Sequence, residues 1–100
     1  MTAPDAETAE RVGMVVVDER LAACANVVSG VTSIYRWEGQ IQKEAEVLVI
    51  VKTTVDVVGR LMERIAELHP YEVPELLALP AEVGAEKYLS WVRSEVGVSE

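Results

Sequence analysis

The sequence predicts an α+β fold in which helical and extended segments alternate. The stretch from Cys24 to Thr54 is typical of two long β-strands joined at Glu38-Gly39-Gln40, because β-branched and aromatic residues dominate its first half. The segments before and after this hairpin show helical spacing, most clearly from Val55 to Leu68. Because 100 residues provide one hydrophobic core, we predict a single domain over residues 1–100.

The first helix is predicted from about Pro4 to Ala23. Thr2 and Asp5 have the spacing of a capping box, and Pro4 suits a first helical turn. Strong helix formers flank the β-prone run in the middle of this segment, and we therefore favour a helix. The side chains expected to form its buried stripe are Met14, Val17 and Leu21, widened by Val12 and Val16.

The hairpin is predicted to project into water at its tip and to enter a core at its base. Apolar and polar residues alternate up to Val47, which places Glu44 and Glu46 on a solvent-exposed face. The run from Val47 to Val51 is apolar on both faces, so both faces should be covered. At ~3.4 Å per residue each arm could exceed about 40 Å, more than a small domain needs. This surplus length predicts pairing with another chain.

The C-terminal half is predicted to contain two helices and a short strand. A helix from Val55 to Leu68, capped by Thr53 or Thr54, ends before Pro70. A rigid linker from His69 to Glu75 follows, because its two prolines fix φ. We then expect a buried strand at Leu76–Leu79, and a helix from Gly84 to Val96 with Gly97 as C-cap. The side chains expected to face inward are Val58, Leu61, Ile65 and Leu68 in the first helix, and Tyr88, Val92 and Val96 in the second.

The predicted order α, β, β, α, β, α corresponds to a ferredoxin-like βαββαβ core without its first strand and with an extra C-terminal helix. In that topology the first strand lies inside the sheet, beside the third. A chain beginning at Met1 should therefore leave a slot in its own sheet. Another segment would fill this slot, or the missing strand lies upstream of Met1.

The composition excludes several classes of function. Nine basic residues against 17 acidic residues give a net charge of −8, which argues against nucleic acids and anionic membranes as partners. This charge is compatible with the attraction of cations. A single cysteine excludes an intrachain disulfide framework, so a cytoplasmic location is expected. The sequence has no Ser-His-Asp set in a plausible context, glycine-rich phosphate loop or zinc spacing, so we predict neither enzyme activity nor a required cofactor.

Five motifs along the chain share one resemblance. They are Leu21–Asn26, Thr32–Gly39, Lys52–Thr54, His69–Glu75 and Tyr88–Trp91. In these residues the chain resembles the CutA family, the divalent-cation tolerance proteins, and the resemblance extends from Thr2 to Val96. It implies a ferredoxin-like domain in a tight homotrimer whose long hairpins pair with neighbouring subunits. It also implies a link to copper tolerance and the binding of divalent metal ions.

The candidate metal ligands are His69, Glu72 and Cys24. His69 either caps the preceding helix or binds a cation such as Cu(II), which imidazole suits. Glu72, together with Glu75, either completes such a site or is solvated. Cys24 is either a thiol ligand or a small hydrophobe at a helix-to-strand junction.

Two positions depart from the ligand pattern that the resemblance implies. Some bacterial members have a cysteine at the end of the first strand, where this chain has Met1. Those members also have two histidines before the Pro-Tyr, where this chain has Leu68 and His69. Of the three ligands proposed for those members, only His69 is present.

The remaining candidates are aromatic and basic residues that suit a subunit interface or the edge of a pocket. They are Tyr35, Arg36, Trp37, Tyr71 and Trp91. Packing between subunits is one interpretation. The alternative is a trimeric signalling or scaffold module, similar to PII proteins, that binds a small ligand or a protein partner between subunits. In that case Arg36 and Lys52 would hold an anionic ligand.

Overall fold

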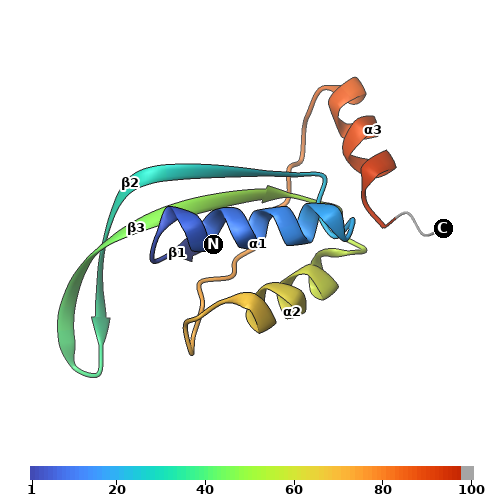
Figure 1. Cartoon of the computed structure of the whole chain (residues 1–100). Coiled ribbons are helices and arrows are strands. Elements are labelled where there is room, and N and C mark those ends of the chain that lie inside the picture. Colours follow the sequence, from blue (N-terminus) through green and yellow to red (C-terminus); the bar gives the residue numbers. More distant parts are fainter. Residues whose placement is uncertain (98–100) are drawn as a thin grey trace.

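A computed structural model describes residues 1–97, in which three helices accompany a three-stranded antiparallel sheet. The elements are β1 (Thr2–Ala3), α1 (Ala6–Asp18), β2 (Cys24–Trp37), β3 (Gln40–Lys52), α2 (Val58–Leu68) and α3 (Glu86–Glu95). The strands lie in the order β1-β3-β2. Figure 1 shows a long curved β2–β3 ribbon with α1 lying along its base and its tip projecting beyond the helices. The predicted α+β class is confirmed.

The β2–β3 hairpin forms as predicted. Its register runs from the Cys24–Lys52 pair to a two-residue turn at Glu38 and Gly39. Both turn residues have positive φ, 50° and 77°, which matches the twist of the flanking strands. The longest dimension of the molecule is 45 Å, in keeping with arms of the predicted length.

A β-bulge interrupts the hairpin between its base and its tip. Val28 pairs with Leu48, but the next pair is Val31 with Glu46, so β2 contains one extra residue. Gly30 lies in this bulge with φ of 86°, a left-handed conformation that glycine adopts without a steric penalty. Bulges bend a strand and increase its twist, which agrees with the curvature of the hairpin in Figure 1.

The residues before α1 form a strand, and the slot expected beside β3 is therefore filled in part. Thr2 pairs with Leu48 and Ala3 with Val47, which places β1 next to β3 as in the ferredoxin-like topology. The N-cap of α1 is Asp5, whose Oδ1 accepts a hydrogen bond of 2.8 Å from the Thr8 amide. The capping box predicted with Thr2 is wrong, because Thr2 belongs to β1 and pairs with Leu48.

The first helix is shorter than predicted, and its buried stripe contains the predicted Val12 and Val16 but not Met14 or Val17. It ends at Asp18, shortly before Arg20 adopts a φ of 60°. Met14 is 74% exposed and Val17 is also exposed, so the predicted stripe is wrong at these positions. The buried residues of α1 are Ala9, Val12, Gly13 and Val16. The small residues among them bring the helix close to β2: a Cβ added at position 13 would lie 3.3 Å from the Cβ of Ala25.

The stripe predicted for α2 is confirmed. Leu61 and Ile65 are buried, while Val58 and Leu68 are half-buried. The predicted threonine caps are wrong, because the Thr53 hydroxyl instead donates to the Leu21 carbonyl oxygen at 2.7 Å. No helix within residues 1–97 is long and apolar enough to cross a bilayer.

Helix α3 forms within the predicted range of Gly84 to Val96, but it is shorter and spans Glu86–Glu95. Val92 and Val96 are buried together with Ala23 and Val57, so this end of the chain packs on the base of the hairpin and the start of α2. The prediction that Tyr88 faces inward is wrong, since its side chain is exposed. The C-terminal cap at residue 97 has the expected positive φ of 70°.

The buried strand predicted at Leu76–Leu79 does not form within the part of the chain that the structure describes. Leu77 is 79% exposed and Leu79 is 88% exposed, while Leu76 packs against the main core. The prediction rested on the burial of these leucines. No other part of residues 1–97 covers Leu77 or Leu79.

We expect Val16→Ala to lower the free energy of unfolding by about 2 kcal/mol, because it removes two fully buried methyl groups. Met14→Ala should change it by less than about 0.5 kcal/mol, since Met14 points into solvent. Urea denaturation at one fixed protein concentration measures both values. Equal losses in the two variants would show that the outer face of α1 is covered in solution.

Candidate functional site

His69 lies at the end of α2 and is 7% exposed. Its amide caps the helix by donating to the Ile65 carbonyl oxygen at 2.8 Å. The Nδ1 atom of its ring accepts a hydrogen bond of 3.1 Å from the Tyr71 amide. The Nε2 atom lies 2.7 Å from the carbonyl oxygen of Thr2, an acceptor, so Nε2 must carry the proton. His69 is therefore a neutral imidazole with both ring nitrogens engaged.

Tyr71 joins this histidine to a buried carboxylate. Its ring lies against that of His69, with 4.6 Å between centroids. Its hydroxyl donates to Oε2 of Glu46 at 2.7 Å. Glu46 is 8% exposed, so its predicted place on the solvent-exposed face is wrong, because the linker after α2 covers it.

The electrostatic environment of Tyr71 favours its neutral phenol. Burial raises the pKa of Tyr71, and its hydrogen bond to Glu46 raises that pKa further. The negative charges of Glu46 and Glu44 and the nearby Tyr35 phenol act in the same direction. Tyr71 thus remains a hydrogen-bond donor to Glu46 at neutral pH.

Cys24 lies at another place on the sheet. It pairs with Lys52, whose Nζ lies 4.0 Å from Sγ and contacts the side-chain oxygen of Asn26. Thr2, the partner of the His69 ring, pairs with Leu48 instead. Lys52 and Leu48 are four residues apart on β3, so roughly 13 Å of sheet separates the two positions.

The structure does not bring the three predicted metal ligands together within one chain. His69 and Cys24 occupy the separate positions just described, and Glu72 is exposed on the linker. No group of three or more His, Cys, Asp or Glu side chains suited to a metal ion occurs within residues 1–97. Any site built from these residues therefore needs donors from another chain or from water.

The predicted interface residues form two separate groups. Tyr35, Arg36 and Trp37 lie in the distal half of the hairpin, and Tyr71 lies over Glu46 near Tyr35. Trp91 belongs to α3, where its ring packs 5.8 Å from that of Tyr88. All of these side chains are exposed in the single chain.

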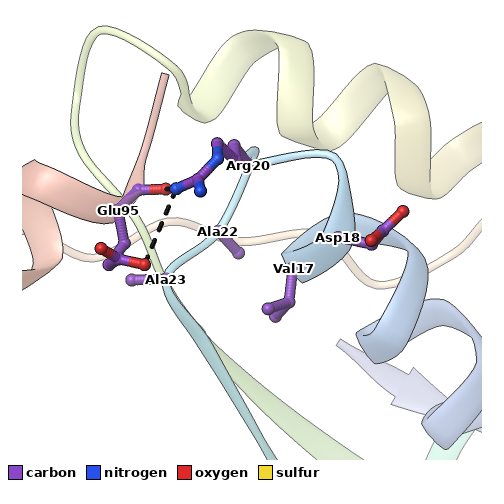
Figure 2. A pocket seen from close by; sticks show the side chains of 6 residues that line it. All are labelled: Val17, Asp18, Arg20, Ala22, Ala23 and Glu95. Atoms are coloured by element: carbon purple, nitrogen blue, oxygen red, sulfur yellow. Dashed lines mark hydrogen bonds and ion pairs between the residues drawn. The ribbon is translucent and has the colours of Figure 1, made fainter. Parts of the chain in front are cut away.

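A hollow of about 200 Å³ lies between the turn after α1 and the end of α3. Figure 2 shows Arg20 reaching across it to Glu95, with Nη1 3.7 Å from the carboxylate and 3.4 Å from the main-chain oxygen. The Gly97 amide donates to the carbonyl oxygen of Arg20 at 2.8 Å. The hollow contains none of the predicted site residues, and it is smaller than most ligand pockets. We interpret the hollow as a gap between packed segments and not as a ligand site. Its lining residues are Val17, Asp18, Arg20, Ala22, Ala23 and Glu95.

Sequence reasoning identified His69 and Tyr71 but missed the partners that hold them. Thr2 contributes only a main-chain oxygen, for which no side-chain signal exists. Glu46 falls in an alternating pattern that indicated exposure, although it directly precedes the apolar run of β3. That position next to Val47 is the one signal that could have indicated burial.

Comparison with known protein families matches residues 1–95 to the family described as CutA1 divalent ion tolerance protein. The chain belongs to this family. The divalent-cation tolerance protein CutA of Thermus thermophilus is 47% identical over 97 residues, which cover 97% of this chain and 94% of that protein. Human protein CutA is 44% identical over 93 residues, or 93% of this chain, and the match spans 52% of its length.

Solved CutA structures confirm the ferredoxin-like fold of the chain. The divalent cation tolerance protein (Cut A1) of Thermus thermophilus superposes with a TM-score of 0.94 at 48% identity, over 96% of this chain and 93% of that one. CutA1 from Oryza sativa also gives a TM-score of 0.94, at 41% identity, over 98% of this chain and 90% of that one.

We expect Tyr71→Phe to destabilise this CutA protein by about 1–3 kcal/mol, because it leaves the buried Glu46 carboxylate without its hydrogen-bond donor. Tyr88→Phe is the matched control, since no hydrogen bond involves the Tyr88 hydroxyl within residues 1–97. Urea denaturation near neutral pH measures both. A loss no larger than that of the control would contradict the role given to the Tyr71–Glu46 contact.

The same variant should change the response to alkaline pH. The pKa of Tyr71 is higher in the folded chain than its unfolded value near 10. Its contribution to stability is therefore complete below about pH 10 and is lost as the pH rises further. As the pH rises above about 10, the difference in free energy of unfolding between the original chain and Tyr71→Phe should shrink. The difference in free energy of unfolding between the original chain and Tyr88→Phe should stay constant over the same pH range.

Proposed function

We propose that this chain acts in tolerance to divalent cations by binding them reversibly as a homotrimer, and not by catalysis. The observation that carries the proposal is the family match over residues 1–95, with 47% identity to a relative named as a divalent-cation tolerance protein. The net charge of −8 also favours the attraction of cations.

Exposed apolar side chains on the hairpin support the trimer. Ile34 is 69% exposed and Ile41 is 62% exposed. The cross-strand pairs Ile34–Lys43 and Arg36–Ile41 place them on one face of the distal hairpin. Leu77 and Leu79 of the linker before α3 are exposed as well. Large apolar side chains that gather on an exposed face usually mark an interface.

The proposed cations are Cu(II) and other divalent metals of similar ligand preference. Imidazole and thiolate donors suit copper, which heads the affinity order of the divalent first-row metals. The predicted donors His69, Glu72 and Cys24 lie apart in one chain. Few protein donors per ion make binding weak, which suits the reversible buffering of a cation in excess.

Native mass spectrometry of the full chain should show a trimer that binds Cu(II) in a fixed ratio to subunits. Glu72→Gln and Cys24→Ser each remove one predicted donor and should weaken binding by at least ~10-fold if that donor holds the ion. Glu82→Gln, which removes an exposed carboxylate of the loop before α3, is the matched control. A trimer without bound copper at any accessible concentration would contradict the proposed function.

The interface can be tested by placing a charge on the apolar face of the hairpin. Ile34→Lys should convert the trimer to monomers, because it would bury a third positive charge on the face that already holds Lys43 and Arg36. Val55→Lys is the control, since Val55 is 91% exposed and lies in the turn before α2. An Ile34→Lys variant that stays trimeric would exclude this face from the interface.

The alternative function, a PII-like module that binds a small ligand between subunits, has less support. Two hollows of about 200 and 240 Å³ occur in the described chain, below the usual size of ligand pockets. Neither includes Tyr35, Arg36, Trp37, Tyr71 or Trp91. A metabolite that raises Tm, with the shift abolished in Arg36→Ala, would favour this alternative.

The cytoplasmic location stays a prediction from the single cysteine. One relative of known structure, from Archaeoglobus fulgidus, is described as a periplasmic divalent cation tolerance protein; it is 33% identical, with a TM-score of 0.91 over 94% of this chain and 91% of that one. Cell fractionation with an antibody against the chain would decide between the two compartments.

A further inference from the structure

The distal part of the hairpin, between the bulge at Gly30 and the turn, has two faces of different chemistry. Residues paired across two strands lie on the same face of a sheet, and successive residues alternate between the faces. The pairs Ile34–Lys43 and Arg36–Ile41 therefore share one face. We call it the cationic face, because Arg36 and Lys43 carry its charge.

The opposite face combines aromatic rings with carboxylates. It holds Tyr35, Trp37 and Glu44, which alternate along the strands with the residues of the cationic face. Tyr71 of the linker lies on it as well, where its hydroxyl donates to Glu46. We call it the anionic face, because no paired residue between the bulge and the turn adds a basic group to it.

Both faces are exposed beyond the helices, where the tip of the hairpin projects in Figure 1. On the anionic face, Tyr35 and Trp37 are each 42% exposed. Every ion pair found within residues 1–97 involves other side chains, so Arg36, Lys43 and Glu44 have no charged partner in that part of the chain. Each face therefore suits a partner that carries the complementary charge and a large apolar side chain.

The complement of each face is the other face of the same hairpin. Two cationic faces in contact would bring Arg36 and Lys43 of one copy against the same residues of the next. Two anionic faces would oppose Glu44 with Glu44, and like charges at an interface are strongly unfavourable. A cationic face on an anionic face pairs opposite charges. This contact uses two different surfaces of each copy, and such heterologous contacts close into rings when the rotation between copies allows it.

We propose that copies of this chain assemble head to tail, with the cationic face of one hairpin on the anionic face of the next. Lys43 pairs with Glu44 of the neighbouring copy, and Arg36 stacks on the Tyr35 and Trp37 rings, an arrangement that guanidinium groups favour. The inference rests on the homotrimer of the proposed function and adds which surfaces meet. It gives the assembly a direction and excludes a two-fold pairing of the hairpins.

Exchanging the two charges of the proposed pair tests this arrangement. The swapped chain combines Lys43→Glu with Glu44→Lys, so its copies restore the pair with opposite polarity and should assemble with one another. A ring of three that contains both kinds of chain has one contact between two positive side chains and one between two negative side chains. Original and swapped copies should therefore sort into separate trimers.

Native mass spectrometry of chains refolded together measures this sorting. One chain carries an isotope label, because the swap leaves the mass unchanged. Random assembly of equal amounts puts about three quarters of the trimers in mixed form. The head-to-tail pairing should lower that share at least ~10-fold. The control is Glu10→Arg with Arg11→Glu, which exchanges two neighbouring exposed charges of α1 and should mix at random with the original chain.

Two single variants keep the test decisive if the swapped chain does not fold. Lys43→Glu leaves carboxylates at both positions of the pair, and Glu44→Lys leaves two amines there. Each variant then disfavours contact with its own kind and favours contact with the other. Refolded together, they should place more than the random share of about three quarters in mixed trimers. A random share would contradict the pairing.

The outcomes separate the inference from the function on which it rests. Random mixing of original and swapped chains overturns the head-to-tail pairing and leaves the homotrimer in place. Preferential mixing of these two chains also overturns it, because that result requires like faces to meet. Failure of the original chain to assemble at all overturns the pairing and the proposed homotrimer together.

Discussion

The antiparallel ladder between β2 and β3 is the constraint on which the remaining structure depends. α1 lies on its base through the close approach of Gly13 to Ala25, and within residues 1–97 β1 pairs with no strand other than β3. The linker after α2 is held by the contact from Tyr71 to Glu46, a residue of the same ladder. The register of the hairpin thus decides which side chains every other element meets, and a shift of one residue would turn Glu46 to the opposite face.

Features that depend on local sequence could be predicted, whereas those that depend on a distant neighbour could not. The hairpin and α2 follow from alternation and from helical spacing, which a segment displays by itself. The stripe predicted for α1 was right at Val12 and Val16 but wrong at Met14. The helix instead turns its small residues toward the sheet, as Gly13 shows, and exposes Met14. The strand expected at Leu76–Leu79 needed a covering surface that residues 1–97 do not provide.

The candidate site also combines features that could be predicted with features that could not. The sequence singled out His69 as a helix end and as a metal ligand, and the structure adds hydrogen bonds that occupy both ring nitrogens. The partners responsible are a main-chain oxygen at Thr2 and a main-chain amide at Tyr71, neither of which a residue type reveals.

The long sequence separation of the His69–Thr2 contact has a consequence for synthesis on the ribosome. β1 is made first, but the residue that fastens it is made 67 positions later. At the ~5–20 residues per second of translation, this interval is roughly 3–13 s. Within that interval Val47 and Leu48 are made, so β1 can pair with β3 before His69 exists. The hydrogen bond from His69 is therefore added to a strand that is already paired, and it completes the N-terminal part of the fold late in synthesis.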